Sequence, residues 1–138
     1  MNDAVTLKMA LPRIPDIELV ALEGLDRLAR HLGIADEKIG EARLVVTEAI
    51  INAFEHSGDK NPVVRVEFRM TPKELTVFVR DYGKGFEPSA VEDPDLQAKM
   101  GSKNKRGWGL KIMQSLSDGF RIQSGKTGTK ITITKLLS

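Results

Sequence analysis

The chain has no cysteine, few aromatic residues and no long apolar run, and each of these gaps excludes a class of protein. Without cysteine, disulfides and thiolate metal sites are excluded, and the composition agrees with a reducing compartment. Aromatic residues make up 5% of the chain, too few for a platform that stacks nucleic-acid bases. No segment approaches the roughly 20 apolar residues of a membrane-spanning helix, and the N-terminus alternates polar and apolar residues instead of forming the apolar block of a signal peptide. We therefore expect a cytoplasmic protein that has no membrane partner.

A surplus of one charge sign is also missing. Lys and Arg number 21 against 19 Asp and Glu, which gives a net charge of +2. A dedicated nucleic-acid binder concentrates basic residues, so we expect no direct contact with nucleic acid. The length of 138 residues and the hydrophobic content of 41% suit one domain with an ordinary core. We expect a single domain over residues 1–138.

The apolar periodicity predicts an α+β fold. A helix is expected after Asp16, which can cap its N-terminus, and Gly33 supplies its end. A longer helix is expected over residues 36–56, and residues 71–73 form the turn of an antiparallel hairpin. We predict a two-layer α/β sandwich, with the helices on one face of a mixed, mostly antiparallel sheet. Alternating strand patterns occur at 5–11, 64–70, 75–79, 120–123 and 131–134.

A row of polar residues accompanies the apolar stripe of the longer helix. Glu48, Asn52 and His56 are spaced by four, so at about 100° per residue they share one side of the helix. The amide oxygen of Asn52 suits Mg²⁺, an ion that favours oxygen ligands. Glu48, one turn earlier, could accept a proton from an attacking hydroxyl or water. By itself the row is equally consistent with solvated residues on a polar helix edge.

A first glycine-rich string begins at Asp81, at the end of a predicted strand. Its carboxylate could accept a hydrogen bond from an exocyclic amine such as that of adenine. Gly83 and Gly85 would let the backbone approach a base and sugar without an intervening Cβ. An ordinary Asp-x-Gly turn explains the string equally well.

A second glycine-rich string, Gly107-Trp108-Gly109-Leu110, opens a predicted helix. A helix N-terminus attracts phosphate, and glycines permit close contact. Arg106 and the lysines at 99, 103 and 105 add cations that could screen charge on a γ-phosphate. The segment 87–105 between the two strings lacks a sustained period and is a candidate lid. Neither string has the Walker spacing, because no Gly-Lys-Ser/Thr occurs, and a plain loop-to-helix turn is the alternative.

Taken together and in this order, the three strings predict an ATP site, and the chain resembles the Bergerat-fold ATPases, the superfamily of gyrase, Hsp90, histidine kinases and MutL. The segment 48–56 is similar to their N box, 81–86 to their G1 box and 107–110 to their G2 box. Within this superfamily, Val46-Thr47-Glu48-Ala49 and the closing Gly128-Thr129 most resemble anti-sigma factor serine kinases of the RsbW and SpoIIAB type.

The resemblance implies an ATP-dependent serine/threonine protein kinase and anti-sigma factor. Its substrate would be a STAS-domain anti-anti-sigma partner, a sigma factor would be a further partner, and the cofactors would be ATP and Mg²⁺. The resemblance makes Glu48 the catalytic base, Asn52 the Mg²⁺ ligand and Asp81 the adenine acceptor. The other nucleotide-binding residues that it implies are His56, Gly83, Gly85, Phe86, Arg106, Gly107, Gly109, Leu110 and Thr129.

The alternative function is a non-catalytic switch that binds nucleotide and sequesters a partner. Phosphoryl transfer depends largely on positioning, so intact boxes do not prove turnover. An ATP-driven clamp would need a transducer domain that 138 residues cannot hold. We also expect a homodimer, for which Leu44, Ile51 and the N-terminal helix are candidate interface elements.

Overall fold

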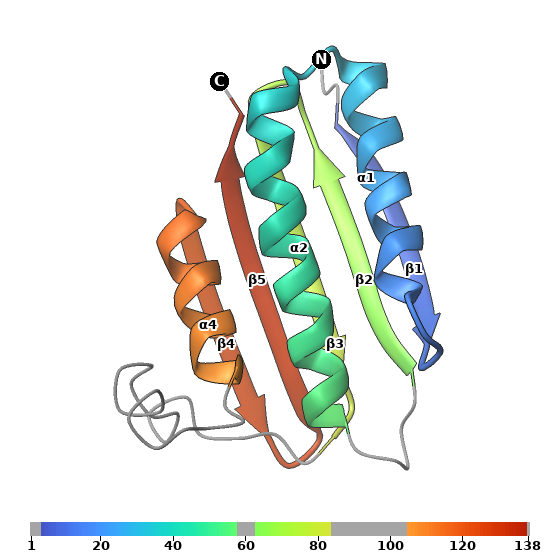
Figure 1. Ribbon diagram of the computed structural model, residues 1–138, viewed down its shortest axis with the longest axis vertical. Coiled ribbons are helices and arrows are strands. Elements are labelled where there is room, and N and C mark those ends of the chain that lie inside the picture. Colours follow the sequence, from blue (N-terminus) through green and yellow to red (C-terminus); the bar gives the residue numbers. More distant parts are fainter. Residues whose placement is uncertain (1–3, 58–62, 84–104, 138) are drawn as a thin grey trace.

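The computed structural model describes residues 4–57, 63–83 and 105–137, with residues 105–108 in backbone only. The five described strands form one sheet in the order β1-β2-β3-β5-β4, and the three described helices lie on one of its faces (Figure 1). The predicted α+β two-layer sandwich is confirmed. In chain order the elements are β1 Val5–Pro12, α1 Ile17–Leu32, α2 Asp36–Ser57, β2 Val63–Met70, β3 Glu74–Asp81, α4 Lys105–Leu116, β4 Gly119–Gly125 and β5 Gly128–Leu136.

All four pairings between the described strands are antiparallel, whereas the sequence predicts some parallel pairing in a mixed sheet. The predicted hairpin is β2 and β3, in which Val66 lies opposite Val79 and Phe68 opposite Val77. Successive side chains of a strand point to opposite faces of the sheet. These buried residues therefore face the helices, and the polar residues between them, such as Glu67, face away.

The ends of α1 agree with the sequence in position but not fully in mechanism. Asp16 is the residue before the helix, but its side chain makes no capping hydrogen bond and its backbone is left-handed, with φ 62° and ψ 20°. The predicted side-chain cap is therefore wrong. At the other end, the N–H of Gly33 donates to the carbonyl of Arg30 (3.2 Å) and that of Ile34 to Ala29 (2.9 Å), which is the glycine stop that the sequence predicts.

Helix α2 lies over the middle of the sheet, runs along its strands and is the main cover of the core (Figure 1). Each fully buried Val or Ile side chain of this helix stabilises the fold by about 1.5–3 kcal/mol. Since the apolar stripe faces the sheet, the polar row that begins at Glu48 lies beside the core. No helix in the described ranges is long and apolar enough to span a bilayer. The stripe predicted from the sequence is buried throughout: Ile39, Ala42, Val46, Ala49, Ile50 and Ala53.

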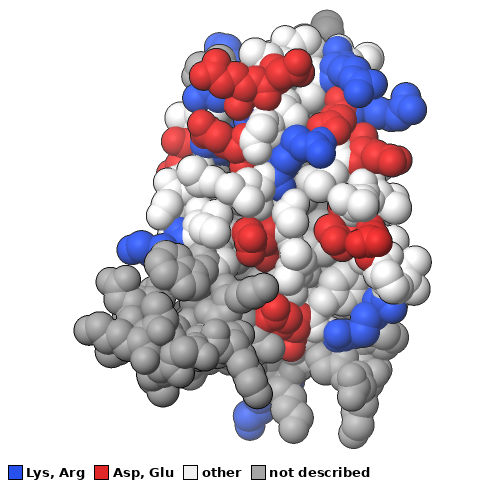
Figure 2. All heavy atoms as spheres, viewed as in Figure 1, with Lys and Arg blue, Asp and Glu red and all other residues white. Residues whose placement is uncertain are grey.

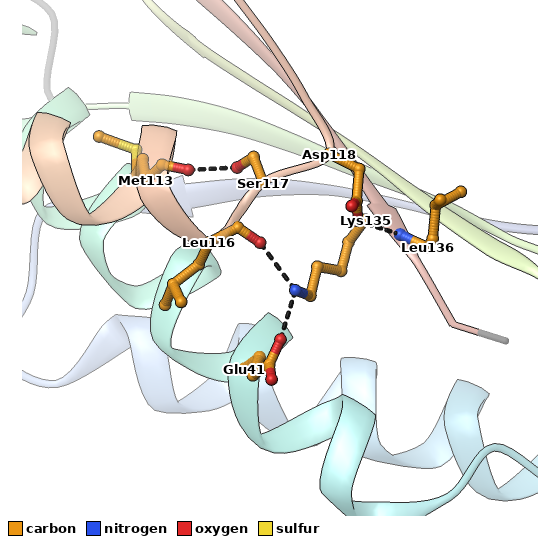
Figure 3. A network of polar contacts seen from close by, with 7 residues as sticks. All are labelled: Glu41, Met113, Leu116, Ser117, Asp118, Lys135 and Leu136. Carbon is orange, nitrogen blue, oxygen red and sulfur yellow. Dashed lines mark hydrogen bonds and ion pairs between the residues drawn. The ribbon is translucent and has the colours of Figure 1, made fainter.

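A polar network attaches the C-terminal end of α4 to the rest of the molecule (Figure 3). Lys135 of β5 is only 6% exposed, and its ammonium donates to the carbonyl of Leu116 (2.7 Å) and pairs with Glu41 of α2. A cation at a helix C-terminus also interacts favourably with the helix dipole. The carboxylate of Asp118 accepts a hydrogen bond from the N–H of Leu136 (2.7 Å), so the connection after α4 is fixed to β5 as well.

Candidate functional site

The amide of Asn52 is buried in the wall between α2 and the core. The residue is 4% exposed, and neither its Oδ1 nor its Nδ2 has a hydrogen-bond partner among the described residues. Leaving a buried donor or acceptor unsatisfied costs about 1–3 kcal/mol, so native structures rarely do so without a reason. A solvated helix edge is therefore excluded for Asn52. Its two polar atoms are suitably placed to bind a ligand.

The carboxylate of Glu48 lies one turn before Asn52, against helix α4. Its Oε2 is 3.0 Å from the position that a Cβ on Gly109 would take, so the absence of a side chain at Gly109 makes room for the carboxylate. Partial burial, and next the negative charge of Glu55, raise the pKa of Glu48. The N-box helix and the G2-box helix thus meet at a carboxylate that accepts a proton more readily than an ordinary glutamate.

Asp81 ends β3 and is 2% exposed. Its Oδ1 accepts hydrogen bonds from the backbone N–H groups of Gly83 (3.0 Å) and Thr129 (3.3 Å). Burial raises the pKa of Asp81, while these two hydrogen bonds and the charges of His56 and Arg80 oppose that rise. Both hydrogen bonds end on Oδ1, and among the described residues no donor reaches Oδ2. The second oxygen is therefore available to a ligand.

Two close backbone contacts surround Asp81, one with the end of α2 and one with the start of β5. A Cβ on Gly83 would lie 2.0 Å from the carbonyl oxygen of His56, so a larger residue would push the chain after β3 away from the N box. A Cβ on Gly128, whose φ is +127°, would lie 2.2 Å from the carbonyl oxygen of Asp81. Sequence reasoning used Gly128 only as part of a motif and missed this contact. A glycine directly before Thr129, which pairs with Asp81, was the available signal.

The structure brings most of the predicted site residues to one end of the molecule. Gly107–Leu110 lie in the first two turns of α4, which begins at Lys105, and Leu110 is 8% exposed. Only the backbone of Arg106 and Gly107 is described. Gly85, Phe86 and the predicted lid up to residue 104 lie outside the described residues. Contacts within the site link Glu48 to Gly109, His56 to Gly83, and Asp81 to Gly83 and Thr129.

A buried amide, a carboxylate against a glycine-bearing helix and a strand-end aspartate agree with a nucleotide site, and comparison with known proteins defines the family. A family model described as the histidine kinase-like ATPase domain matches residues 15–135. The chain belongs to the histidine kinase-like ATPase domain family. The predicted Bergerat-fold resemblance is therefore confirmed.

Named relatives in this family bear on the subfamily. Serine-protein kinase RsbW of Bacillus subtilis is 28% identical over 144 residues, which cover 99% of this chain and 89% of the relative. An anti-sigma F factor of Clostridium acetobutylicum is 32% identical over 108 residues, which cover 72% of this chain and 71% of the relative. These names confirm the resemblance to the RsbW and SpoIIAB type.

A solved structure shares the fold. The crystal structure of the RsbU and RsbW domains of a Mycobacterium tuberculosis protein has a TM-score of 0.68 and 20% sequence identity to this chain. The match covers 96% of this chain and 32% of the solved one, so the chain spans about a third of that protein's length. At this identity the likeness concerns the histidine kinase-like ATPase fold alone.

Proposed function

We propose that the chain is an ATP-dependent serine/threonine protein kinase and anti-sigma factor that phosphorylates a STAS-domain anti-anti-sigma protein. The buried Asn52 amide, which has no hydrogen-bond partner among the described residues, carries the proposal, because it requires a polar ligand at the N box. The enzyme class, a protein serine kinase, agrees with the name of the Bacillus subtilis relative. The anti-sigma role agrees with the name of the Clostridium acetobutylicum relative.

In this proposal Asp81 selects the adenine base. The two backbone N–H groups on Oδ1 hold the carboxylate in one orientation. Its Oδ2 accepts a hydrogen bond from the exocyclic amine of adenine. The close approach of Gly83 to the end of α2 keeps the base site next to the N box. The hydroxyl of Thr129, 2.8 Å from that of Ser124, lies beside this site and completes its polar wall.

Asn52 is the residue that would hold Mg²⁺. Its buried Oδ1 fits the ion, because Mg²⁺ binds hard oxygen atoms and obtains most other ligands from phosphate and water. When bound, the ion supplies charge that neutralises the phosphates and orients them for transfer. The contribution of Asn52 is to fix the position of the phosphates relative to Glu48 on the same helix.

Glu48 acts as the general base. Its carboxylate takes the proton of the substrate serine while the serine oxygen bonds to the γ-phosphorus and ADP leaves with the electrons of the broken P–O bond. The raised pKa of Glu48 favours this step, because a more basic carboxylate accepts a proton more readily. This feature also favours a kinase over a non-catalytic switch, which needs no base. The nearby N-terminal half of α4 suits the phosphates, as helix N-termini do.

The proposal includes a homodimer and a sigma factor as a second partner. Leu44 and Ile51 of α2 are 44% and 38% exposed, so both remain candidates for a contact between copies. A partner-switching role follows if the sigma factor and the STAS protein compete for the kinase. The whole chain forms one nucleotide-binding domain in this interpretation.

The decisive experiment measures transfer from γ-labelled ATP to a set of candidate STAS-domain proteins. Wild-type protein is expected to label one of them. Glu48→Gln should keep Mg-ATP binding and lose transfer by about 10²- to 10⁴-fold, the usual contribution of a general base. Glu37→Gln, an exposed acid in the first turn of the same helix, is the matched control and should retain the wild-type rate.

Two results would contradict the proposal. A Glu48→Gln protein that transfers phosphate at the wild-type rate would remove Glu48 as the base. Wild-type protein that binds ATP but labels no STAS protein would instead support the non-catalytic switch.

A further inference from the structure

The face of the sheet that turns away from the helices carries a row of positive charges. Arg65 of β2 lies opposite Arg80 of β3, and Arg80 lies opposite Lys130 of β5. Because directly paired residues of neighbouring strands project from the same face, the three cations are adjacent. Like charges placed directly opposite each other in a sheet are destabilising. The row therefore lowers the stability of the isolated protein.

No ion pair in the described part of the chain involves this row. The charge of Arg80 does act on Asp81, whose pKa it lowers, and the Arg80 guanidinium carbon lies 5.0 Å from the centroid of the Tyr82 ring. The ion pairs of the described residues involve other cations. Glu67, two residues after Arg65 on the same strand and the same face, pairs with Arg69 at 3.3 Å. The helix side of the molecule differs, because its acidic and basic side chains are intermixed over the surface (Figure 2). The sheet face that the described helices leave open thus carries a local excess of positive charge, on a chain whose net charge is only +2.

The same face has a hollow with an apolar residue among the cations. Its volume is about 600 Å³, and its lining includes Lys8, Phe78, the cation row and one acid, Glu67. The ammonium of Lys130 lies 5.5 Å from the centroid of the Phe78 ring, and the guanidinium carbon of Arg69 lies 5.6 Å from it. The hollow therefore offers an apolar contact and several hydrogen-bond donors side by side.

We propose that this face, formed by Arg65, Arg80, Lys130 and Phe78, binds an acidic segment of a partner protein in which carboxylates flank an apolar side chain. Carboxylates of the segment would bind the guanidinium groups of Arg65 and Arg80, which suit bidentate contacts, and the ammonium of Lys130. The apolar side chain would pack on Phe78. The proposal is independent of the kinase assignment, because it concerns the sheet face that the helices and the nucleotide-site residues leave uncovered.

The charges disfavour other occupants. Two copies of the chain packed through this face would oppose one cation row to another. Glu67 in the lining disfavours a continuous anionic surface such as a phosphate backbone or a membrane, and neither of these requires the apolar contact at Phe78. An acidic peptide segment can place its carboxylates and its apolar side chain separately.

The test measures binding of a labelled peptide of alternating Glu and Leu to the full chain, by fluorescence anisotropy at increasing salt. Wild-type protein should bind it with an affinity that falls as salt screens the charges. The double variant Arg65→Glu with Lys130→Glu should bind about tenfold more weakly or worse, since attraction becomes repulsion. The matched control, Arg27→Glu with Arg30→Glu on exposed positions of α1, should bind as the wild type does.

Two further variants separate charge from packing. Phe78→Ala should weaken binding of the Glu-Leu peptide and leave binding of a Glu-Ser peptide unchanged. Arg65→Gln with Lys130→Gln, which removes the repulsion without adding acids, should weaken peptide binding while raising the midpoint of thermal unfolding. This neutral variant keeps the proposal testable if the charge-reversed one fails to fold.

Several outcomes would overturn the proposal. Peptide binding that is equal in wild type and in the neutral variant would exclude the face as its site. Tighter binding of duplex DNA or of phosphatidylserine vesicles, lost in the same variants, would assign the face to a nucleic acid or a membrane. A change of oligomeric state in the Arg65 and Lys130 variants, without a change in peptide affinity, would assign the face to a second copy of the chain.

Discussion

Helix α2 borders two buried polar groups whose surroundings are opposite in kind. Near the beginning of the helix, the ammonium of Lys135 is bound by the carbonyl of Leu116 and the carboxylate of Glu41 (Figure 3). In its C-terminal half, the amide of Asn52 is equally buried and has no partner among the described residues. Lys135 thus has hydrogen-bond partners and Asn52 has none in the described ranges, although both groups are removed from water.

The contrast indicates a structural role for Lys135 and a ligand-binding role for Asn52. A satisfied buried network stabilises one arrangement of the elements that supply it, here α2, α4 and β5. An unsatisfied buried amide is unfavourable in the folded state and becomes favourable only when a ligand binds. Substitution of Lys135 should therefore lower stability and leave nucleotide binding intact. Substitution of Asn52 should weaken nucleotide binding without lowering stability.

The largest effect is expected from Asn52→Leu, which keeps the branched shape of the side chain and removes both polar atoms. We expect the affinity for Mg-ATP to fall by about 10- to 100-fold, the usual scale for losing a metal-supporting residue. The free energy of unfolding should stay the same or rise by about 1–3 kcal/mol, because no unsatisfied amide remains. Isothermal titration with Mg-ATP, repeated with ATP and EDTA as a control, checks the first result, and urea denaturation checks the second. An unchanged Mg-ATP affinity would show that the Asn52 amide does not bind the Mg-nucleotide.

A smaller effect with the opposite pattern is expected from Lys135→Ala. The variant loses the hydrogen bond to Leu116 and the packing of a buried aliphatic chain, so the free energy of unfolding should fall by about 1–2 kcal/mol. Mg-ATP affinity should remain within a few-fold of the wild type, because Lys135 lies at the far end of α4 from Gly109. Lys126→Ala, at an exposed turn, is the control for loss of a lysine. A loss of nucleotide binding larger than the loss of stability would contradict a purely structural role.

The Lys135 network also predicts a dependence on pH. The hydrogen bond and the charge of Lys135 lower the pKa of Glu41 below its usual value. The Glu41 carboxylate therefore ionises at lower pH in the folded state than in the unfolded state. The resulting stabilisation is present above the unfolded pKa of about 4.5 and is lost as pH falls through the lower folded value. Acid titration of unfolding should show less of this loss in Glu41→Gln, and an identical slope would contradict it.

The smallest effect is expected from Glu55→Gln, two turns after Glu48 on α2. The charge of Glu55 helps to raise the pKa of Glu48, so its removal should lower that pKa. Because a general base must be deprotonated, the acid limb of the rate–pH profile for phosphotransfer should move to lower pH. Single-turnover transfer at saturating Mg-ATP measures the limb, with Glu37→Gln as the control. A limb that moves equally in both variants would remove the link between Glu55 and Glu48.

Much of the fold was predictable from the sequence because its elements are locally encoded. The stripe from Ile39 to Ala53 repeats at the helical period, and Gly33 supplies a stop that uses only neighbouring backbone groups. The strand patterns predicted at 64–70 and 75–79 form the hairpin of β2 and β3. The cap at Asp16 failed because a residue type favoured at a helix start does not determine its own backbone dihedral angles.

The candidate site was predictable in composition but not in geometry. The spacing of Glu48 and Asn52 places both on one side of a helix, whatever that helix packs against. The burial of Asn52 with no partner in the described part of the chain, and the contact of Glu48 with Gly109, depend on how α2 and α4 pack together. The role of Lys135 had no sequence signal, because an alternating strand pattern would place an apolar residue at a buried position.

By itself, the amino-acid sequence determined the helices, the strands and the order of the three boxes, because hydrophobic period and residue spacing act over a few neighbouring residues. Only the tertiary structure decided which distant residues meet. Strand register placed Arg65, Arg80 and Lys130 in one row, and helix packing brought Glu48 to Gly109. Charge repulsion, burial and pKa depend on distances between atoms that lie far apart along the chain, and folding alone sets those distances.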